Sequence, residues 1–392
     1  MRIVIAPDSF KGSLSAIDAA NAMAAGVLQV WPQAELTLCP IADGGEGTVA
    51  ALVQAAHGSL VSETVTGPLG QAVTATWGLI HGGRTAVIEM AQASGLLLVP
   101  PQQRNPLVTT TYGTGELIKR ALDRGCRRFI IGIGGSATND GGAGMAQALG
   151  VSLRDASGNE LPFGGAALAG FTEIDISGLD PRVKEAEFVV ACDVDNPMVG
   201  PQGASAVYGP QKGATPAMVA ELDAALAIYA EKMAAVLGVA VANMPGAGAA
   251  GGLGGGLVAF LGARLERGIQ VVSAAVGLEE IIRQADLVIT GEGQVDGQTL
   301  CGKAVHGVVE IAHRYGIPAI VLGGAVRPSA DALCEAFGSV SVLSIVNEPM
   351  SLEHAMANAA SLLQSATARG LRLIKTGMVL GQDAAQLFPK RK

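Results

Sequence analysis

Several acidic and small polar side chains follow short apolar runs of the sequence, at the points where those runs end. The runs RIVIA, FIIGIG, EFVVAC and LVIT have the composition of buried strands. Carboxylates in such places suit a Mg²⁺ ion, which prefers oxygen ligands, or a general base that accepts a hydroxyl proton. The ordinary alternative is that they cap helices and shape turns. The residues concerned are Asp8, Ser9, Ser136, Thr138, Asn139, Asp140, Asp193, Asp195, Asn196, Glu292 and Asp296.

Two glycine-rich stretches could bind anions. The first, GIGGSATNDGG (132–142), lies between an apolar run and an Ala-rich helical run, and the second is PGAGAAGGLGGG (245–256). A glycine turn before a helix presents unpaired backbone N–H groups and the positive end of the helix dipole, which attract phosphate. Neither stretch matches a Walker A loop or the GxGxxG pattern of dinucleotide folds, so tight packing is an open alternative. The candidates for phosphate are Gly134, Gly135, Ser136, Thr138, Asn139, Gly141 and Gly142, and those for a small substrate are Gly246 and Gly248.

Three lysines lie in glycine-containing loops instead of on charged helix faces: Lys11, Lys212 and Lys303. Such a lysine can serve as a point charge for a phosphate or carboxylate, although a solvated side chain is the common alternative. Arg127 and Arg128 stand at the start of a predicted strand, the wrong end for a ligand. No metal-spaced histidine cluster and no GxSxG nucleophile motif occurs in the sequence.

The elements that must position these residues alternate between strand and helix. RIVIAPD, a helical run from about Ser13 to Trp31, and AELTLCPIAD form a βαβ opening, and the last third repeats this order. Apolar strands between helices predict a parallel sheet covered on both faces. We therefore expect an α/β protein with a discontinuous, doubly wound, Rossmann-like domain from residues 1–64 and 273–392. A second α/β domain, 65–272, is inserted, and the active site is expected in the cleft between the two.

Composition excludes several classes of function. The chain has 392 residues, 15% charged residues and a net charge of −8, which disfavours nucleic acid and anionic membranes as partners. The five cysteines are scattered and never in CxxC spacing, so neither a disulfide framework nor a zinc site is expected. No signal peptide and no membrane-length apolar run is evident, which makes the cytoplasm the expected location.

Longer motifs carry a family resemblance. APDSFKGSLSA, ADGGEGT, VTGPLG, TTYGTGELI, IGIGGSATNDGGAGM, ACDVDNPMVGPQGAS, YGPQKGA, PGAGAAGGLG and ITGEGQVDGQTLCGK occur in this order between Arg2 and about Leu363. The sequence resembles the glycerate kinase type 1 family of bacteria. The resemblance implies ATP-dependent phosphorylation of D-glycerate in the cytoplasm, in glyoxylate or aldarate breakdown, by two α/β domains with the active site between them. It implies 2-phosphoglycerate as the product, with the 3-phosphate as the alternative.

Phosphoryl transfer asks a protein mainly for positioning, charge neutralisation and a proton acceptor. Asp193 is our first candidate for the base and Asp296 the second, while Asp8 or Glu292 is expected to hold Mg²⁺. The candidates for the glycerate carboxylate or the transferred phosphoryl group are Lys11, Ser9 and Ser13, with Lys212 a further substrate contact and Lys303 a further phosphate contact. Which glycine loop takes ATP and which takes glycerate is left open.

Two rival functions come from other classes. A doubly wound sheet with glycine loops could carry NAD in a hydroxy-acid dehydrogenase, although the GxGxxG pattern and a ribose-binding acid are missing. A two-lobed, non-catalytic protein that binds a small acid is the other rival. The sequence leaves a homo-oligomer open.

Overall fold

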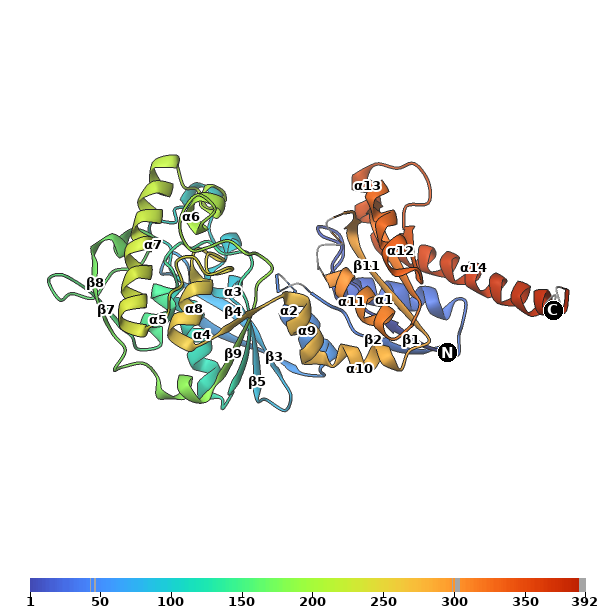
Figure 1. Ribbon diagram of the computed structural model, residues 1–392, viewed down its shortest axis with the longest axis horizontal. Coiled ribbons are helices and arrows are strands. Elements are labelled where there is room, and N and C mark those ends of the chain that lie inside the picture. The colour runs from blue at the N-terminus through green and yellow to red at the C-terminus, as the bar shows by residue number, and fades with distance from the viewer. Residues whose placement is uncertain (43, 46, 298, 300–303, 388–392) are drawn as a thin grey trace. The chain divides into compact units, whose positions relative to one another are not determined.

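The computed structural model describes residues 1–42, 44–45, 47–297, 299 and 304–387 (Figure 1). The chain forms two compact units. Unit 1 consists of Met1–Ala42 and Ser273–Lys392, and unit 2 of Asp43–Val272. The chain is therefore mixed α/β, with one unit assembled from both chain ends.

The first crossing between the units comes earlier than the expected residue 64. The segment that begins at Asp43 belongs to unit 2. The reason is β3 (Ser59–Thr66), which pairs antiparallel along its whole length with β4 (Ala72–Ile80) of unit 2. Since a strand that shares its ladder hydrogen bonds with unit 2 folds with that unit, residues 43–64 do not join the discontinuous one. The second crossing lies between Val272 and Ser273.

Unit 1 is built on a five-stranded parallel sheet in the order β13-β12-β11-β1-β2. Its strands are β1 (Arg2–Ile5), β2 (Glu35–Leu38), β11 (Leu287–Val295), β12 (Ala319–Val326) and β13 (Val340–Ser344). The strand order reverses between β1 and β11, because β2 adds on one side of β1 and the later strands on the other. In open α/β sheets, ligands bind beyond the carboxyl ends of the strands at such a reversal.

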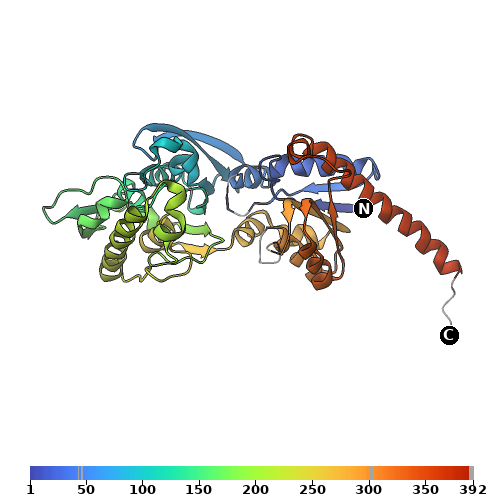
Figure 2. The ribbon, with the colours of Figure 1, turned by 90° about the horizontal axis from the view of Figure 1, so that it is seen from above.

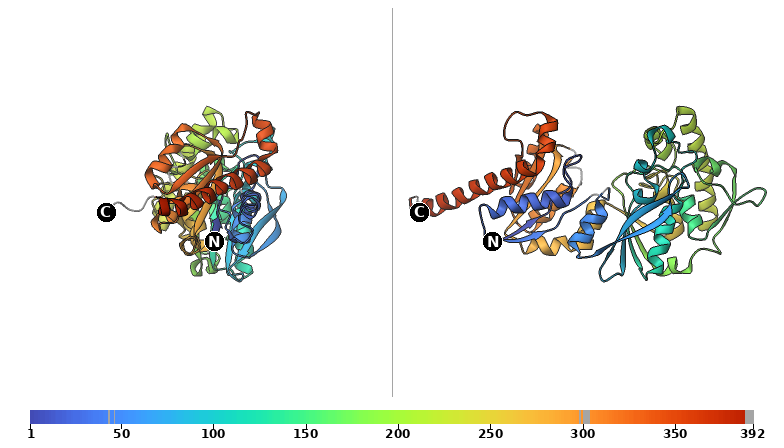
Figure 3. Two further views of the ribbon diagram at one scale, coloured as in Figure 1. Left: turned by 90° about the vertical axis from the view of Figure 1, so that its right-hand side faces the viewer. Right: turned by 180° about the vertical axis from the view of Figure 1, so that it is seen from behind.

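Helices cover both faces of this sheet. They are α1 (Ala16–Leu28), α10 (Leu278–Arg283), α11 (Ala304–Arg314), α12 (Asp331–Phe337), α13 (Leu352–Ala357) and α14 (Ala359–Leu387), and α9 (Gly268–Val276) carries the chain in from unit 2. The N-cap of α1 is Ser15, whose hydroxyl accepts the Asp18 N–H at 3.1 Å. Helices α1 and α14 lie side by side over one face (Figure 3), where Ile3, Ile5 and Ile289 join their cluster, and α11 packs on the strands from the other face.

The C-terminal part of α14 extends beyond the other elements of unit 1 (Figure 2). Leu371 is buried against the sheet, whereas Leu373, Met378, Val379 and Leu380 are exposed. Among the described residues no helix is both long and apolar enough to span a bilayer.

Unit 2 is built on a six-stranded mixed sheet in the order β10-β9-β6-β5-β4-β3. Beyond the β3–β4 hairpin, its strands are β5 (Thr85–Glu89), β6 (Arg128–Gly132), β9 (Glu187–Ala191) and β10 (Arg264–Glu266), and these four run parallel. A separate antiparallel pair is formed by β7 (Ser152–Asp155) and β8 (Phe171–Asp175). The parallel strands bring several loops to one carboxyl edge, where the sequence predicted a site.

The helices of unit 2 pack around a core of large apolar side chains. They are α2 (Thr48–Ala55), α3 (Ala91–Ser94), α4 (Tyr112–Asp123), α5 (Ala143–Ala148), α6 (Ala204–Tyr208), α7 (Pro216–Leu237) and α8 (Leu253–Leu261). Trp77, Phe129, Phe188 and Tyr229 are almost completely buried, and the rings of Phe129 and Phe188 stack across β6 and β9 with centroids 4.6 Å apart. This cross-strand stacking contributes to holding the two strands that lead into the candidate site.

Candidate active site

The glycine loop after β6 exposes only its first turn. Gly134 and Gly135 are exposed, whereas all residues from Ser136 to Asp140 are buried. Gly135 has a φ of +73°, and its carbonyl accepts the Leu96 N–H at 2.8 Å. The Ala137 N–H donates to the Ser94 carbonyl at 2.9 Å, which ties the loop to α3. The part of the loop that could meet a ligand is therefore the Gly134–Gly135 turn.

Asp140 accepts hydrogen bonds from backbone amides that the sequence predicted to bind phosphate. Its carboxylate accepts the Gly142 N–H at 3.2 Å and the Gly144 N–H at 3.3 Å, and its backbone carbonyl accepts the Ala143 N–H. It also accepts the Thr111 N–H at 2.8 Å and the Thr111 hydroxyl at 2.9 Å. Because the amides at the start of α5 already have these partners, Gly142 presents no open amide to phosphate in this arrangement. Burial raises the pKa of the Asp140 carboxyl, and these donors act against that rise.

The remaining buried side chains of the loop point to neighbouring loops. The Asn139 amide donates to the Ser205 hydroxyl at 2.9 Å, at the start of α6. Thr138 Oγ1 and Asn139 Oδ1 are buried without a hydrogen-bond partner among the described residues. Each of these two oxygens therefore keeps an unused acceptor position.

Lys212 lies inside unit 2, not at its surface. It is only 1% exposed, and its ammonium donates to the Thr138 carbonyl at 2.6 Å. Burial lowers the pKa of Lys212 to about 7, and the charge of Asp140 acts in the opposite direction. This side chain was expected to contact substrate as a point charge. In this structure it instead lies below the surface and supports the glycine loop through its hydrogen bond to Thr138.

The two glycine-rich stretches pack directly against each other. A Cβ on Gly251 would lie 2.0 Å from the Thr138 carbonyl oxygen, and one on Gly256 would lie 2.4 Å from the Gly141 carbonyl oxygen. The Gly141 N–H donates to the Gly251 carbonyl at 3.0 Å. Close backbone approach therefore accounts for most glycines of the second stretch, whereas a Cβ on Gly141 would meet the Tyr229 and Leu226 side chains. The two stretches form a single packed body.

Gly246 and Gly248, the expected substrate contacts, lie beside the loop that follows β9. A Cβ on Gly248 would lie 2.0 Å from the Pro197 carbonyl oxygen, and one on Gly246 would lie 3.2 Å from the Cys192 sulfur. The Gly248 N–H donates to the Asn196 carbonyl at 3.0 Å. Both glycines are thus explained by packing in this structure.

Asp193 is exposed at the carboxyl end of β9. Its Oδ1 accepts the Gly268 N–H, the first residue of α9, at 3.0 Å. Its neighbours Asp195 and Asn196 diverge: Asp195 lies 4.0 Å from Arg267, while Asn196 Oδ1 accepts the Tyr208 hydroxyl at 2.6 Å. Asp193 is thus positioned by α9 and is accessible to solvent, as a general base must be to substrate.

In unit 1, the residues that follow β1 lie against β11. The Asp8 N–H donates to the Gly291 carbonyl at 2.9 Å. A Cβ on Gly293 would lie 3.2 Å from the backbone nitrogen of Lys11. Asp8 and Glu292 therefore stand on adjacent segments at the reversal of strand order. Asp8 Oδ1 accepts the Ser9 N–H at 2.6 Å, and Lys11 is exposed.

The other predicted residues of unit 1 differ in their hydrogen-bond partners. Ser13 donates its hydroxyl to the Phe10 carbonyl at 2.9 Å, which makes it a turn residue. The buried Thr299 hydroxyl donates to Glu292 Oε1 at 2.8 Å and accepts the Asp296 N–H at 3.1 Å, so it links these two acids. Asp296 Oδ2 also accepts the Gln294 amide at 2.7 Å. Lys303 lies outside the described residues.

The residues at the reversal of strand order have the type of ligand atom that Mg²⁺ prefers. Asp8 and Glu292 offer hard carboxylate oxygens, and Mg²⁺ is usually bound by one or two carboxylates together with water and substrate phosphates. A complete protein cage is not expected for such an ion. The described ranges contain no group of three or more His, Cys, Asp or Glu residues that could hold a metal by themselves.

Sequence reasoning missed several residues at the carboxyl edge of unit 2. Glu89, the last residue of β5, is 4% exposed and accepts the Val49 N–H at 2.8 Å. Thr111, the N-cap residue of α4, donates to Asp140 and its hydroxyl accepts the Met145 N–H at 3.0 Å. The placement of Glu89 directly after an apolar run was the signal that could have found it.

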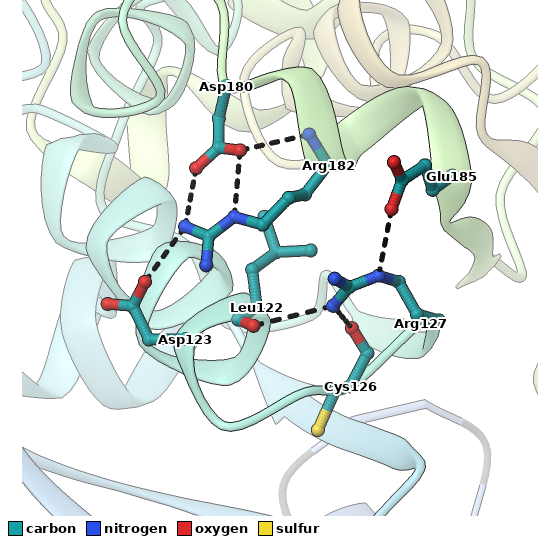
Figure 4. Close-up of polar contacts among 7 residues, drawn as sticks. All are labelled: Leu122, Asp123, Cys126, Arg127, Asp180, Arg182 and Glu185. Carbon is teal, nitrogen blue, oxygen red and sulfur yellow. Dashed lines mark hydrogen bonds and ion pairs between the residues drawn. The ribbon is translucent and has the colours of Figure 1, made fainter.

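The amino edge of the same sheet holds surface ion pairs (Figure 4). Arg182 bridges Asp180 and Asp123 at 2.7 and 2.8 Å, while Arg127 contacts Glu185 at 3.4 Å. Arg127 also donates to the Cys126 carbonyl at 2.9 Å. These contacts give the arginines at the strand starts structural partners, at the edge opposite the candidate site.

Comparison with known proteins identifies the group to which this arrangement belongs. The sequence matches the profile of the Glycerate kinase family over residues 3–375. A glycerate kinase of Bacillus subtilis (strain 168) is 52% identical over 379 residues, which cover 96% of this chain and 99% of the relative. A glycerate 2-kinase of Escherichia coli (strain K12) is 52% identical over 359 residues, which cover 92% and 94%, respectively.

A solved structure gives the same result. The crystal structure assigned to glycerate kinase 2 from Salmonella typhimurium LT2 superposes on this chain with a TM-score of 0.87 at 51% identity. The match covers 96% of this chain and 99% of that one. The sequence profile, the relatives and the fold therefore agree, and this chain belongs to the glycerate kinase family.

Proposed function

We propose that this kinase transfers the γ-phosphoryl group of ATP to the 2-hydroxyl of D-glycerate, with Mg²⁺, and releases 2-phosphoglycerate and ADP. The observation that carries the proposal is the 52% identity, over 92% of this chain, to a glycerate 2-kinase. Family membership disfavours both rivals, the hydroxy-acid dehydrogenase and the non-catalytic binding protein.

In this proposal, unit 1 supplies charge neutralisation. Asp8 and Glu292 hold Mg²⁺, and Lys11 and Ser9 contact the glycerate carboxylate or the transferred phosphoryl group. The support is their shared place at the reversal of strand order, where the Asp8 N–H meets the Gly291 carbonyl. When bound, Mg²⁺ would neutralise charge on the phosphate oxygens. Lys11 is exposed, and so it can reach a ligand.

Unit 2 supplies the proton acceptor and a phosphate-facing turn. Asp193 accepts the proton of the attacked hydroxyl while that oxygen bonds to the γ-phosphorus, and the bond to the bridging β,γ-oxygen breaks so that ADP leaves. Asp193 suits this role because it is exposed and oriented by the Gly268 N–H. Asp296 is the alternative base, and Gly134 with Gly135 faces phosphate.

The experiment is a proton-coupled ³¹P NMR spectrum of the product made from D-glycerate and Mg-ATP. A phosphate on C2 couples to one proton and gives a doublet, whereas a phosphate on C3 couples to two and gives a triplet. We expect the doublet, and L-glycerate should give little product. A triplet would move the reaction to the 3-hydroxyl, and the absence of any phosphoester would reject the kinase.

The location, metabolic role, partners and oligomeric state are further parts of this proposal. The reaction is placed in the cytoplasm, in the metabolism of glyoxylate or related acids, with small molecules and not nucleic acid as partners. Size-exclusion chromatography with light scattering decides between a monomer and a homo-oligomer.

A further inference from the structure

A single buried carboxylate lies where two helices of unit 2 begin. Asp140 is 1% exposed and accepts hydrogen bonds from Thr111 at the start of α4 and from Gly142 and Gly144 at the start of α5. The amino ends of helices carry partial positive charge, which a carboxylate neutralises. Asp140 therefore acts as a built-in anion for the backbone amides at these two helix starts.

The surrounding residues are fitted to this carboxylate. Thr111 both donates its hydroxyl to Asp140 and accepts the Met145 N–H at 3.0 Å, so it connects the acid to the first turn of α5. A Cβ on Gly144 would lie 2.2 Å from Thr110 Oγ1 and 3.2 Å from Asp140 Oδ2. A side chain added there would therefore have to displace Thr110 and the start of α4, which hold the acid from the other side.

A buried lysine holds the same loop from another element. The Lys212 ammonium donates to the Thr138 carbonyl at 2.6 Å, two residues before Asp140, and Lys212 is 1% exposed. Asp140 and Lys212 thus hold residues 138 and 140 by hydrogen bonds to buried side chains. Only the Gly134–Gly135 turn of the loop stays exposed.

We propose that Asp140 is a positioning residue for phosphoryl transfer: it occupies the amides at the start of α5 and so presents the Gly134–Gly135 turn to the ligand. Lys212 and Thr111 complete this support. The inference rests on the proposed function only in assigning that turn to the ligand. It also changes the earlier expectation for the loop, because the anion at the helix start is the protein's own.

The test removes the carboxylate and then returns it. Asp140→Ala should lower kcat/KM by about 10²-fold, because displacement of a positioned group by about 1 Å has an effect of that size. Sodium formate should recover part of the lost activity by entering the vacated place, and sodium chloride at equal ionic strength should recover less. The wild-type enzyme should show no activation by formate.

Further variants separate positioning from simple loss of stability. Thr111→Val removes the hydroxyl at nearly constant volume and should change KM or kcat, whereas Thr111→Ser keeps the hydroxyl and should retain wild-type values. Asp155→Ala is the control, because Asp155 accepts the Ser157 and Asn159 amides in an exposed turn between β7 and β8. It should lower only the thermal midpoint.

Three results would overturn the proposal. They are wild-type kcat/KM for a folded Asp140→Ala, a folded and impaired Asp140→Ala that does not respond to formate, and wild-type kcat and KM for Thr111→Val well below its melting temperature. If Asp140→Ala does not fold, the comparison of Thr111→Val with Thr111→Ser decides alone. Each variant is compared with the wild-type rate of ADP release, so the outcome is independent of which hydroxyl the NMR spectrum assigns.

Discussion

The two edges of the unit 2 sheet are held by different kinds of polar contact. At the carboxyl edge, Asp140 and Lys212 are each 1% exposed and bond mainly to backbone groups. At the amino edge, Arg128 pairs with Glu187 at 3.1 Å, but these side chains are 64% and 38% exposed. Water competes for the exposed pair and not for the buried groups. The number of ion pairs is therefore a poor guide to which edge is more sensitive to substitution.

The largest difference is expected from one glycine substitution at each edge. Gly251 and Gly125 both have positive φ, at +71° and +89°. Alanine at Gly251 would also meet the Thr138 carbonyl oxygen at 2.0 Å, whereas a Cβ at Gly125 has nothing within 4 Å. We expect a loss in the free energy of unfolding of about 3 kcal/mol for Gly251→Ala and about 1 kcal/mol for Gly125→Ala. Urea denaturation measures both, and equal losses would mean that packing between the glycine stretches contributes little.

The second prediction compares the two ends of β9 in catalysis. Asp193→Asn should lower kcat by about 10²-fold, because an amide cannot accept the hydroxyl proton. Glu187→Gln, at the start of the same strand, should leave kcat unchanged. Steady-state assays of ADP release provide the measurement. If Asp193→Asn retains near-normal turnover and KM for glycerate, the role of base passes to Asp296, which Asp296→Asn would then reveal.

The third prediction concerns pH and the buried lysine. Burial lowers the pKa of Lys212 to about 7 from its usual 10.5, so between these values the unfolded chain holds a proton that the folded chain has released. Stability from this group must therefore rise with pH in that window, by at most about 1.4 kcal/mol per pH unit. Lys212→Met should lose that dependence. Denaturation of both proteins from pH 7 to 9.5 should show different slopes, and parallel curves would assign Lys212 an ordinary pKa.

The smallest effect is expected at the amino edge. Arg182→Gln removes the pairs with Asp180 and Asp123, at 2.7 and 2.8 Å, but the Arg182 side chain is 30% exposed. We expect a loss of about 1 kcal/mol or less, reduced further by added salt. Thermal melts in low and high salt check this. A salt-independent loss of several kcal/mol would place this edge on a par with the buried one.

The placement of many candidate residues in the fold could be predicted from the sequence, because it depends on the local order of strands and polar residues. Polar residues directly after apolar runs lie at the carboxyl ends of the parallel strands, as Asp193 after β9 shows. The arginines at the strand starts lie at the opposite edge, with surface partners. The family motifs added the type of reaction, which strand order and composition could not provide.

The features that could not be predicted from the sequence depend on contacts between distant parts of the chain. The burial of Lys212 arises from its bond to Thr138, and the need for glycine at Gly251 arises from the same loop. Local patterns show a lysine beside glycine and a glycine run, but not what lies opposite them. The early crossing at Ala42 likewise depends on the pairing of β3 with β4.

The contact between the two glycine stretches has a consequence for protein engineering. A Cβ on Gly252 would lie 2.9 Å from the Gly141 Cα, and those on Gly251 and Gly256 would meet the Thr138 and Gly141 carbonyl oxygens. A side chain at any of these three positions therefore needs space that the first stretch must vacate. Libraries aimed at new acceptor acids should therefore randomise both stretches together, or transplant them as a pair from one homologue. Variation at Gly251, Gly252 or Gly256 alone should mostly give proteins of lower stability.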